Sequence, residues 1–115
     1  MATYSKHKLS GSTDGRFIDI AATSSPGTTI HQADPALLDE IVLCAVNDDS
    51  SDRTLNIQFG DNADVLPFTI PAGAGVVFVI PQEAHCLLTN SLVVRGYADA
   101  ANKIWVGGCV NRITN

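Results

Sequence analysis

In the stretch RTLNIQF, residues Arg53–Phe59, apolar and polar side chains alternate without a break. Leu55, Ile57 and Phe59 share one face of an extended chain, and the polar residues between them share the other. This alternation is typical of an antiparallel strand that has one face in a core and the other in water. The stretch therefore predicts β-structure with a solvent-facing side.

Two further stretches are apolar on both faces. Residues 41–46 read IVLCAV and residues 75–80 read GVVFVI, so neither face of either run is polar. A strand of this kind either lies at the centre of a sandwich under a second layer or presents one face to a partner. The sequence leaves open which face is core and which is interface.

Turn-forming residues recur at intervals of about 8–12 residues, which is the spacing of an all-β sandwich or barrel. Further strands are predicted at residues 16–21, 28–32, 65–70, 92–97 and 103–113. Gly107-Gly108 in the last run predicts a β-bulge or the close approach of another backbone. One helical turn is predicted at residues 35–40, with Asp34 as its N-cap. The predicted fold is all-β, a single antiparallel β-sandwich of about eight short strands.

The length of 115 residues predicts one sandwich domain, residues 13–115, preceded by an N-terminal arm, residues 1–12. The arm is polar and poor in strand pattern, so we expect it to order on a partner. Removal of residues 2–9 is then expected to leave the sandwich folded. No apolar run follows the lysines of the arm, so we expect no signal peptide and a soluble chain made in a cytosol.

The charge balance bears on partners. Seven Lys and Arg against twelve Asp and Glu give a net charge of −5, which argues against nucleic acid or an anionic membrane as the main partner. Charged residues make up 17% of the chain, below the roughly 25% of typical soluble domains. The low charge indicates that another protein covers part of the surface.

The cysteines Cys44, Cys86 and Cys109 are an odd number without CxxC spacing. We therefore expect reduced thiols that pack as small apolar side chains, with Cys44 buried in its strand and no intrachain disulfide. Cross-links between copies after release from the cell are left open.

Three groups of residues invite a chemical reading. His85-Cys86 could pair a base with a thiol, but neighbouring side chains of an extended segment point to opposite faces, so we interpret it as a packed cysteine beside a surface histidine. His7, His31 and His85 lack the ligand spacing of a zinc site. Residues 48–52, DDSSD, lack the glycine and the closing glutamate of a calcium loop, and we interpret them as a solvated hairpin tip.

The remaining candidates fail in the same way. The glycine-rich residues 11–15 and 73–75 lack the lysine or the following helix of phosphate and dinucleotide loops. Trp105 and Tyr97 are too few to form a nucleic-acid stacking platform. The sequence predicts no catalytic, cofactor-binding or metal-binding residue, and a protein that is not an enzyme.

Several segments together resemble a family of small structural proteins of tailed bacteriophages. The resemblance depends on the amino-acid sequences of these segments and on their order along the chain. The segments are residues 9–16, 18–23, 26–31, 39–41, 45–47, 70–73, 93–95 and 110–114. The resemblance implies a decoration (cement) protein on the outside of the capsid, with the major capsid protein and other copies of itself, for example trimers, as partners. It carries no catalytic residues.

Other functions remain open at this point. A neck or tail subunit of the same virion is the first alternative, although such subunits often carry a long arm and no loop here exceeds about a dozen residues. A ligand-binding β-sandwich, such as a carbohydrate module, would need exposed aromatic side chains. Aromatic residues are 6% of the chain, and we expect them mostly in core positions. A small hydrolase comes last.

Overall fold

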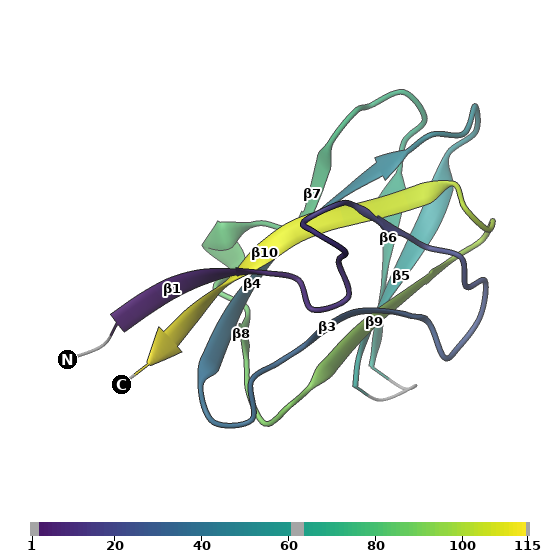
Figure 1. The fold of residues 1–115 in the computed structure, drawn as a ribbon. Coiled ribbons are helices and arrows are strands. Elements are labelled where there is room, and N and C mark those ends of the chain that lie inside the picture. The colour runs from purple at the N-terminus through teal and green to yellow at the C-terminus, as the bar shows by residue number, and fades with distance from the viewer. Residues whose placement is uncertain (1–2, 61–63, 115) are drawn as a thin grey trace.

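Two antiparallel β-sheets pack face to face in the computed structural model, which describes residues 3–60 and 64–114 (Figure 1). The strands are β1 Thr3–Lys8, β2 Ile18–Asp19, β3 Thr28–Gln32, β4 Leu38–Asn47, β5 Arg53–Phe59, β6 Val65–Ile70, β7 Val77–Ile80, β8 Leu87–Leu88, β9 Val93–Ala98 and β10 Ile104–Thr114. A single 3₁₀ turn, η1 Gln82–Ala84, lies between β7 and β8. The predicted antiparallel β-sandwich is confirmed, with ten strands among the described residues where about eight were expected.

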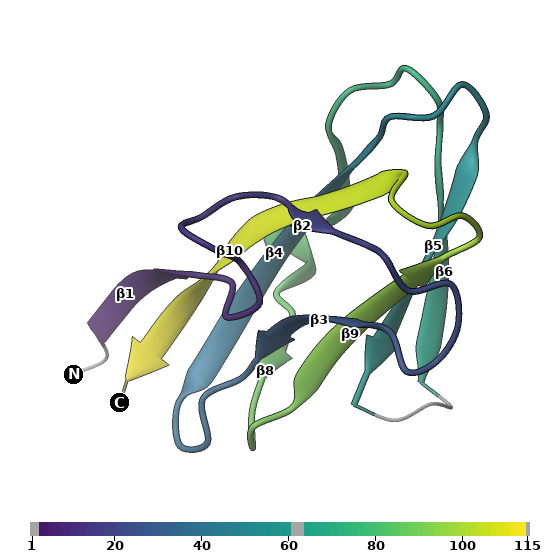
Figure 2. The same ribbon diagram turned by 45° about the vertical axis from the view of Figure 1, so that its right-hand side comes forward.

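The strand order is that of a jelly roll. The six-stranded sheet runs β1-β10-β4-β7, with β2 also beside β10 and β8 beside β4. The four-stranded sheet runs β3-β9-β5-β6. The chain changes sheet between β3 and β4 and again between β4 and β5, as two Greek keys require (Figure 2).

The core fills the space between the sheets. Leu55 and Ile57 of β5 are fully buried, as their alternation predicts, and Val94 of β9 and Val106 of β10 are buried with them. On β4, Ile41, Leu43 and Ala45 face this core with no exposed surface. The opposite face of β4 therefore points away from the core, which answers which side of residues 41–46 is core.

Gly107-Gly108 marks a close approach and not a bulge, because β10 stays in register with β4 through both residues. Gly108 has φ +146°, and a Cβ atom there would lie 1.9 Å from the carbonyl oxygen of Val42. A Cβ atom on Gly107 would lie 2.7 Å from the ring of Phe17. The two glycines thus let β4 and the Phe17 ring lie directly against β10.

The helical turn predicted at residues 35–40 is wrong. Asp34 does accept hydrogen bonds from the backbone N–H groups of Ala36 and Leu37, at 2.8 and 2.9 Å, but the chain then enters strand β4 at Leu38. The extended backbone lets Asp39 point inward to its partners in the sandwich, and these tertiary contacts override the local helix signal.

The N-terminal arm also differs from the expectation. Residues Thr3–Lys8 form β1, an edge strand paired with β10 from Lys8–Cys109 out to Thr3–Thr114. All six residues are exposed, so they show no alternation in the sequence. Leu9 is 1% exposed and belongs to the core, so removal of residues 2–9 would also remove a core side chain.

Residues 48–52 are not a hairpin tip. They join β4 of one sheet to β5 of the other, and these two strands do not pair with each other. Residues 61–64, DNAD, follow Gly60 and are typical of a turn, but residues 61–63 lie outside the described residues.

Candidate functional site

The outward side of the six-stranded sheet carries apolar side chains. Val42 and Cys44 alternate with the core residues of β4 and so point outward. Cys109 of β10 lies opposite Val42, and Phe78 of β7 lies opposite Cys44, so all four side chains share one face. Together with Phe17 over β10, these residues form what we call the apolar face.

Two aromatic side chains of the apolar face are open to solvent. Phe78 is 62% exposed and Phe17 is 41% exposed. The expectation that aromatic residues lie mostly in core positions is wrong, because none of them in the described ranges belongs to the buried core. Phe59 and Phe68 only pack against its margin. A contiguous exposed apolar patch marks a contact surface more often than chance scatter does.

Open hollows lie on this face beside Val42. One of about 310 Å³ is lined by Val42, Phe78, Pro81, Gln82 and Glu83. A second, of about 260 Å³, is lined by Lys6, Glu40, Val42, Gln82, Cys109 and Asn111. The surface is thus uneven, with Phe78 standing above a floor formed by β4 and β10.

Charged side chains border the apolar face on opposite sides. Lys6 on β1 lies at one border, and Glu83 on η1 lies at the other. Glu40 lies between them on β4 and pairs with His85, whose Nδ1 atom is 3.3 Å from a Glu40 carboxylate oxygen. The face therefore has a basic border and an acidic border.

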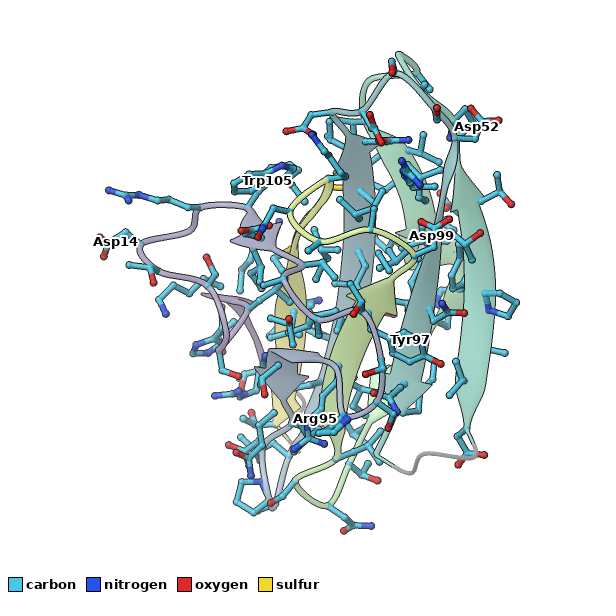
Figure 3. The ribbon with its side chains drawn as sticks, turned by 90° about the vertical axis from the view of Figure 1, so that its right-hand side faces the viewer. Asp14, Asp52, Arg95, Tyr97, Asp99 and Trp105 are labelled. Carbon is cyan, nitrogen blue, oxygen red and sulfur yellow. The ribbon has the colours of Figure 1, made fainter. Side chains whose placement is uncertain are left out.

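The outward side of the four-stranded sheet is polar by contrast. Its central strands β5 and β9 point Thr54, Asn56, Arg95 and Tyr97 outward, and Figure 3 shows Arg95, Tyr97 and then Asp99 along this side. Gln58 is covered by a loop, since its side-chain oxygen accepts a hydrogen bond of 2.8 Å from the N–H of Gly27. The two sheets thus present chemically different surfaces.

A buried ionic cluster joins the sheets away from the apolar face. Asp39 on β4 has no exposed surface and accepts hydrogen bonds from Arg112 of β10 at 2.7 and 3.0 Å. It also contacts Nε2 of His31 on β3 at 2.8 Å. Burial alone would raise the pKa of Asp39, but the hydrogen bonds from Arg112 and His31 outweigh it and lower the pKa to about 2.

The geometry of the cluster fits a structural contact between the sheets and does not fit a catalytic nucleophile with its base. The N–H of Ser10 donates to Nδ1 of His31 at 3.0 Å, so the ring carries its proton on Nε2 and donates it to Asp39. Both ring nitrogens are therefore occupied. His31 is also only 1% exposed, which keeps it away from any substrate in solution. Its contacts tie β3 of one sheet to β4 of the other.

A packed cysteine beside a surface histidine is confirmed at His85-Cys86, but the segment is not extended as expected, because η1 ends at His85 in a left-handed conformation. His85 has φ +50° and a side chain that is 75% exposed, whereas Cys86 packs against the core. Burial raises the pKa of the Cys86 thiol, which makes the thiolate scarcer. His7, His31 and His85 do not converge, and no group of three metal-ligating side chains occurs among residues 3–60 and 64–114.

The acidic residues 48–52 turn to separate partners. Asp49 accepts a hydrogen bond of 2.7 Å from Nε of Arg53, which lowers the pKa of that carboxyl. Asp48 accepts from the indole N–H of Trp105 at 3.1 Å, and Asp52 accepts from the N–H of Ala72 at 2.9 Å. The carboxylates are therefore held apart and do not surround one point.

All three cysteines are free thiols. Cys44 is 8% exposed, as expected, and burial raises the pKa of its thiol. Cys109 is half-buried on the apolar face. It pairs with Val42, which is two residues before Cys44 on β4.

The apolar face was only half visible in the sequence. The runs at residues 41–46 and 75–80 signalled it. Phe17 falls in the strand predicted at residues 16–21, but the structure has only β2 Ile18–Asp19 there, and Phe17 precedes it. Among the described residues no helix has the length and apolar character to cross a bilayer. Searches of family models, of characterised proteins and of solved structures found nothing that matches this chain.

Proposed function

We propose that this chain is a structural protein of a bacteriophage virion. In this proposal it is a decoration protein that binds the outside of the head, in contact with the major capsid protein and with other copies of itself. The resemblance, which is carried by segments spread between residues 9 and 114, supports the phage assignment. The observation that carries the role in assembly is the apolar face, where Phe17 and Phe78 are exposed.

Physical chemistry favours protein contact as the use of this face. Removing apolar surface from water drives association, and the centres of protein interfaces are depleted in charge and enriched in aromatic side chains. Seven basic residues spread along the chain supply no dense positive patch. We therefore expect assembly of the chain on the head, which includes contacts between copies, to depend on apolar area more than on salt-sensitive ion pairs.

A reconstruction of the virion tests the proposal. The expected result is density for this fold repeated over the capsid lattice, on the outer surface. Addition of the purified chain to heads that lack it should fill the same positions. Density confined to a ring at the neck or along the tail would contradict the decoration role and establish the tail alternative.

A ligand-binding β-sandwich is the second candidate, because the exposure of Phe17 and Phe78 removes the argument that aromatic residues lie in the core. Jelly rolls occur both in viral capsid proteins and in lectins, so the fold does not separate the two functions. Titration calorimetry against a panel of oligosaccharides separates them. Saturable binding that Phe78→Ala abolishes would favour this candidate over the virion protein.

A further inference from the structure

The two exposed aromatic side chains stand on opposite sides of β4 at one level of the sheet. Phe17 lies over Gly107 of β10, and Gly107 is the partner of Cys44 on β4. Phe78 of β7 is the other partner of Cys44. Neighbouring strands lie about 4.8 Å apart, so Phe17 and Phe78 flank β4 at similar distances.

The charges flank β4 in the same manner. Lys6 of β1 lies opposite Asn111 of β10, which lies opposite Glu40 of β4. Gln82 of η1 reaches the same hollow from the β7 side, and Glu83, which follows it, lines the neighbouring hollow with Val42 and Phe78. A cation and a carboxylate therefore lie on opposite sides of β4, beside adjoining hollows.

We propose that two copies of the chain pack apolar face to apolar face around a two-fold axis that runs along β4. Such a rotation exchanges the two sides of β4 and preserves the level along it. Phe78 of each copy then meets Phe17 of the other, and Lys6 of each copy meets Glu83 of the other. The proposal rests on the proposed function in taking further copies as partners, and it adds the surface and the symmetry.

A second copy fits this face because the face is complementary to itself. An isologous contact requires that each feature find its counterpart across the axis, and both the aromatic pair and the charged pair do so. The strands β1, β10, β4 and β7 have 6, 11, 10 and 4 residues. At about 3.4 Å per residue and about 4.8 Å between strands, they offer a footprint of about 500 Å² per copy. Two copies would then bury about 1,000 Å² in total, which is the lower bound of a specific interface.

Phe78→Glu tests the surface, with Leu66→Glu as its matched control. Leu66 is 51% exposed on β6, in the other sheet. Sedimentation equilibrium should show a dimer for the unchanged chain and for Leu66→Glu. For Phe78→Glu the dimer dissociation constant should rise at least about tenfold, which corresponds to about one lost apolar anchor. A wild-type monomer at about 1 mM, a trimer, or equal effects of both variants would overturn the proposal.

Charge reversal tests the symmetry. Lys6→Glu and Glu83→Lys should each weaken the dimer, and the double variant should restore it, since the pair forms across the axis. A double variant no tighter than the weaker single variant would overturn the two-fold arrangement. Circular dichroism of each variant checks that the sandwich is intact.

Binding to heads, measured in parallel, separates the two proposals. If the chain is strictly monomeric and still binds heads, the dimer is contradicted and the decoration role is supported. If the dimer forms as predicted but binds no heads, the decoration role is contradicted and the dimer is supported.

Discussion

Asp39→Asn should destabilise the protein at neutral pH and remove the acid sensitivity that Asp39 contributes below pH 4. The substitution keeps the size of the side chain and removes the charge that Arg112 and His31 hold. The pKa of Asp39 falls from its ordinary 3.8 to about 2 on folding. Each unit of difference between the folded and unfolded pKa corresponds to about 1.4 kcal/mol. The charge of Asp39 in the folded state therefore contributes about 2–3 kcal/mol to the free energy of unfolding.

The sign of the pH dependence follows from the direction of the shift. Because the folded pKa lies below the unfolded one, the contribution is complete above about pH 4 and is lost as the pH falls through about 2. The hydrogen bonds give a similar magnitude independently, since a bond to a charged group contributes about 1.5–3 kcal/mol.

Urea denaturation followed by circular dichroism, at intervals from pH 2 to pH 7, measures the effect. The gap between the wild type and Asp39→Asn should be about 2–3 kcal/mol at pH 7 and should close near pH 2. Asp14→Asn, on an exposed loop and at φ +57° that asparagine tolerates, is the matched control and should track the wild type. A gap that is absent at pH 7, or that persists unchanged at pH 2, would refute the reasoning.

Three further outcomes are expected. Gly108→Ala should lower the free energy of unfolding, measured by thermal unfolding, by about 2 kcal/mol or more, because its Cβ atom would strike a β4 carbonyl oxygen. Gly73→Ala has open space around it and should lower the free energy of unfolding by about 1 kcal/mol. Equal losses in the two variants would contradict this expectation. Iodoacetamide should label Cys109 well before Cys44, whose burial raises its thiol pKa, as peptide mass spectrometry can resolve; faster labelling of Cys44 would contradict it. Deletion of residues 2–8, which spares the core residue Leu9, should keep the circular dichroism spectrum and weaken binding to heads; unchanged binding would exclude a role for β1.

Strands that alternate, or that carry β-branched residues between clear turns, could be predicted from the sequence. The ranges of β3, β5 and β6 agree with the prediction to the residue. β1 could not be predicted, because both of its faces are exposed and polar and its formation depends on pairing with β10. Tertiary pairing of this kind leaves no period in the local sequence.

The helical turn failed for a related reason. Asp34 and Pro35 carry a genuine N-terminal signal, and Asp34 does cap the turn that follows. What ends the turn is Asp39, which is drawn inward by Arg112, a residue 73 positions away. A partner so distant in sequence cannot be identified from the local pattern.

The apolar face itself was predictable only as a pair of alternatives. The run at residues 41–46 is apolar on both sides, so it fixes that one side is core without saying which. The sheet packing decides, because β4 lies within the six-stranded sheet and only the face with Ile41, Leu43 and Ala45 is turned to the core. Phe17 joins the face through the absence of a side chain at Gly107, which is a packing relation and not a sequence motif.

The two sheets show that an apolar outer face is not required by this fold. Outward positions of β5 carry Thr54 and Asn56, and that strand forms as well as β4 does. Side chains left in water add little to folding, whereas full burial of a phenylalanine contributes about 1.5–3 kcal/mol. With 62% of its surface exposed, Phe78 keeps more than half of that gain unrealised in the isolated chain, about 1–2 kcal/mol. A contact that covers Phe17, Val42 and Phe78 recovers this free energy, and folding alone does not.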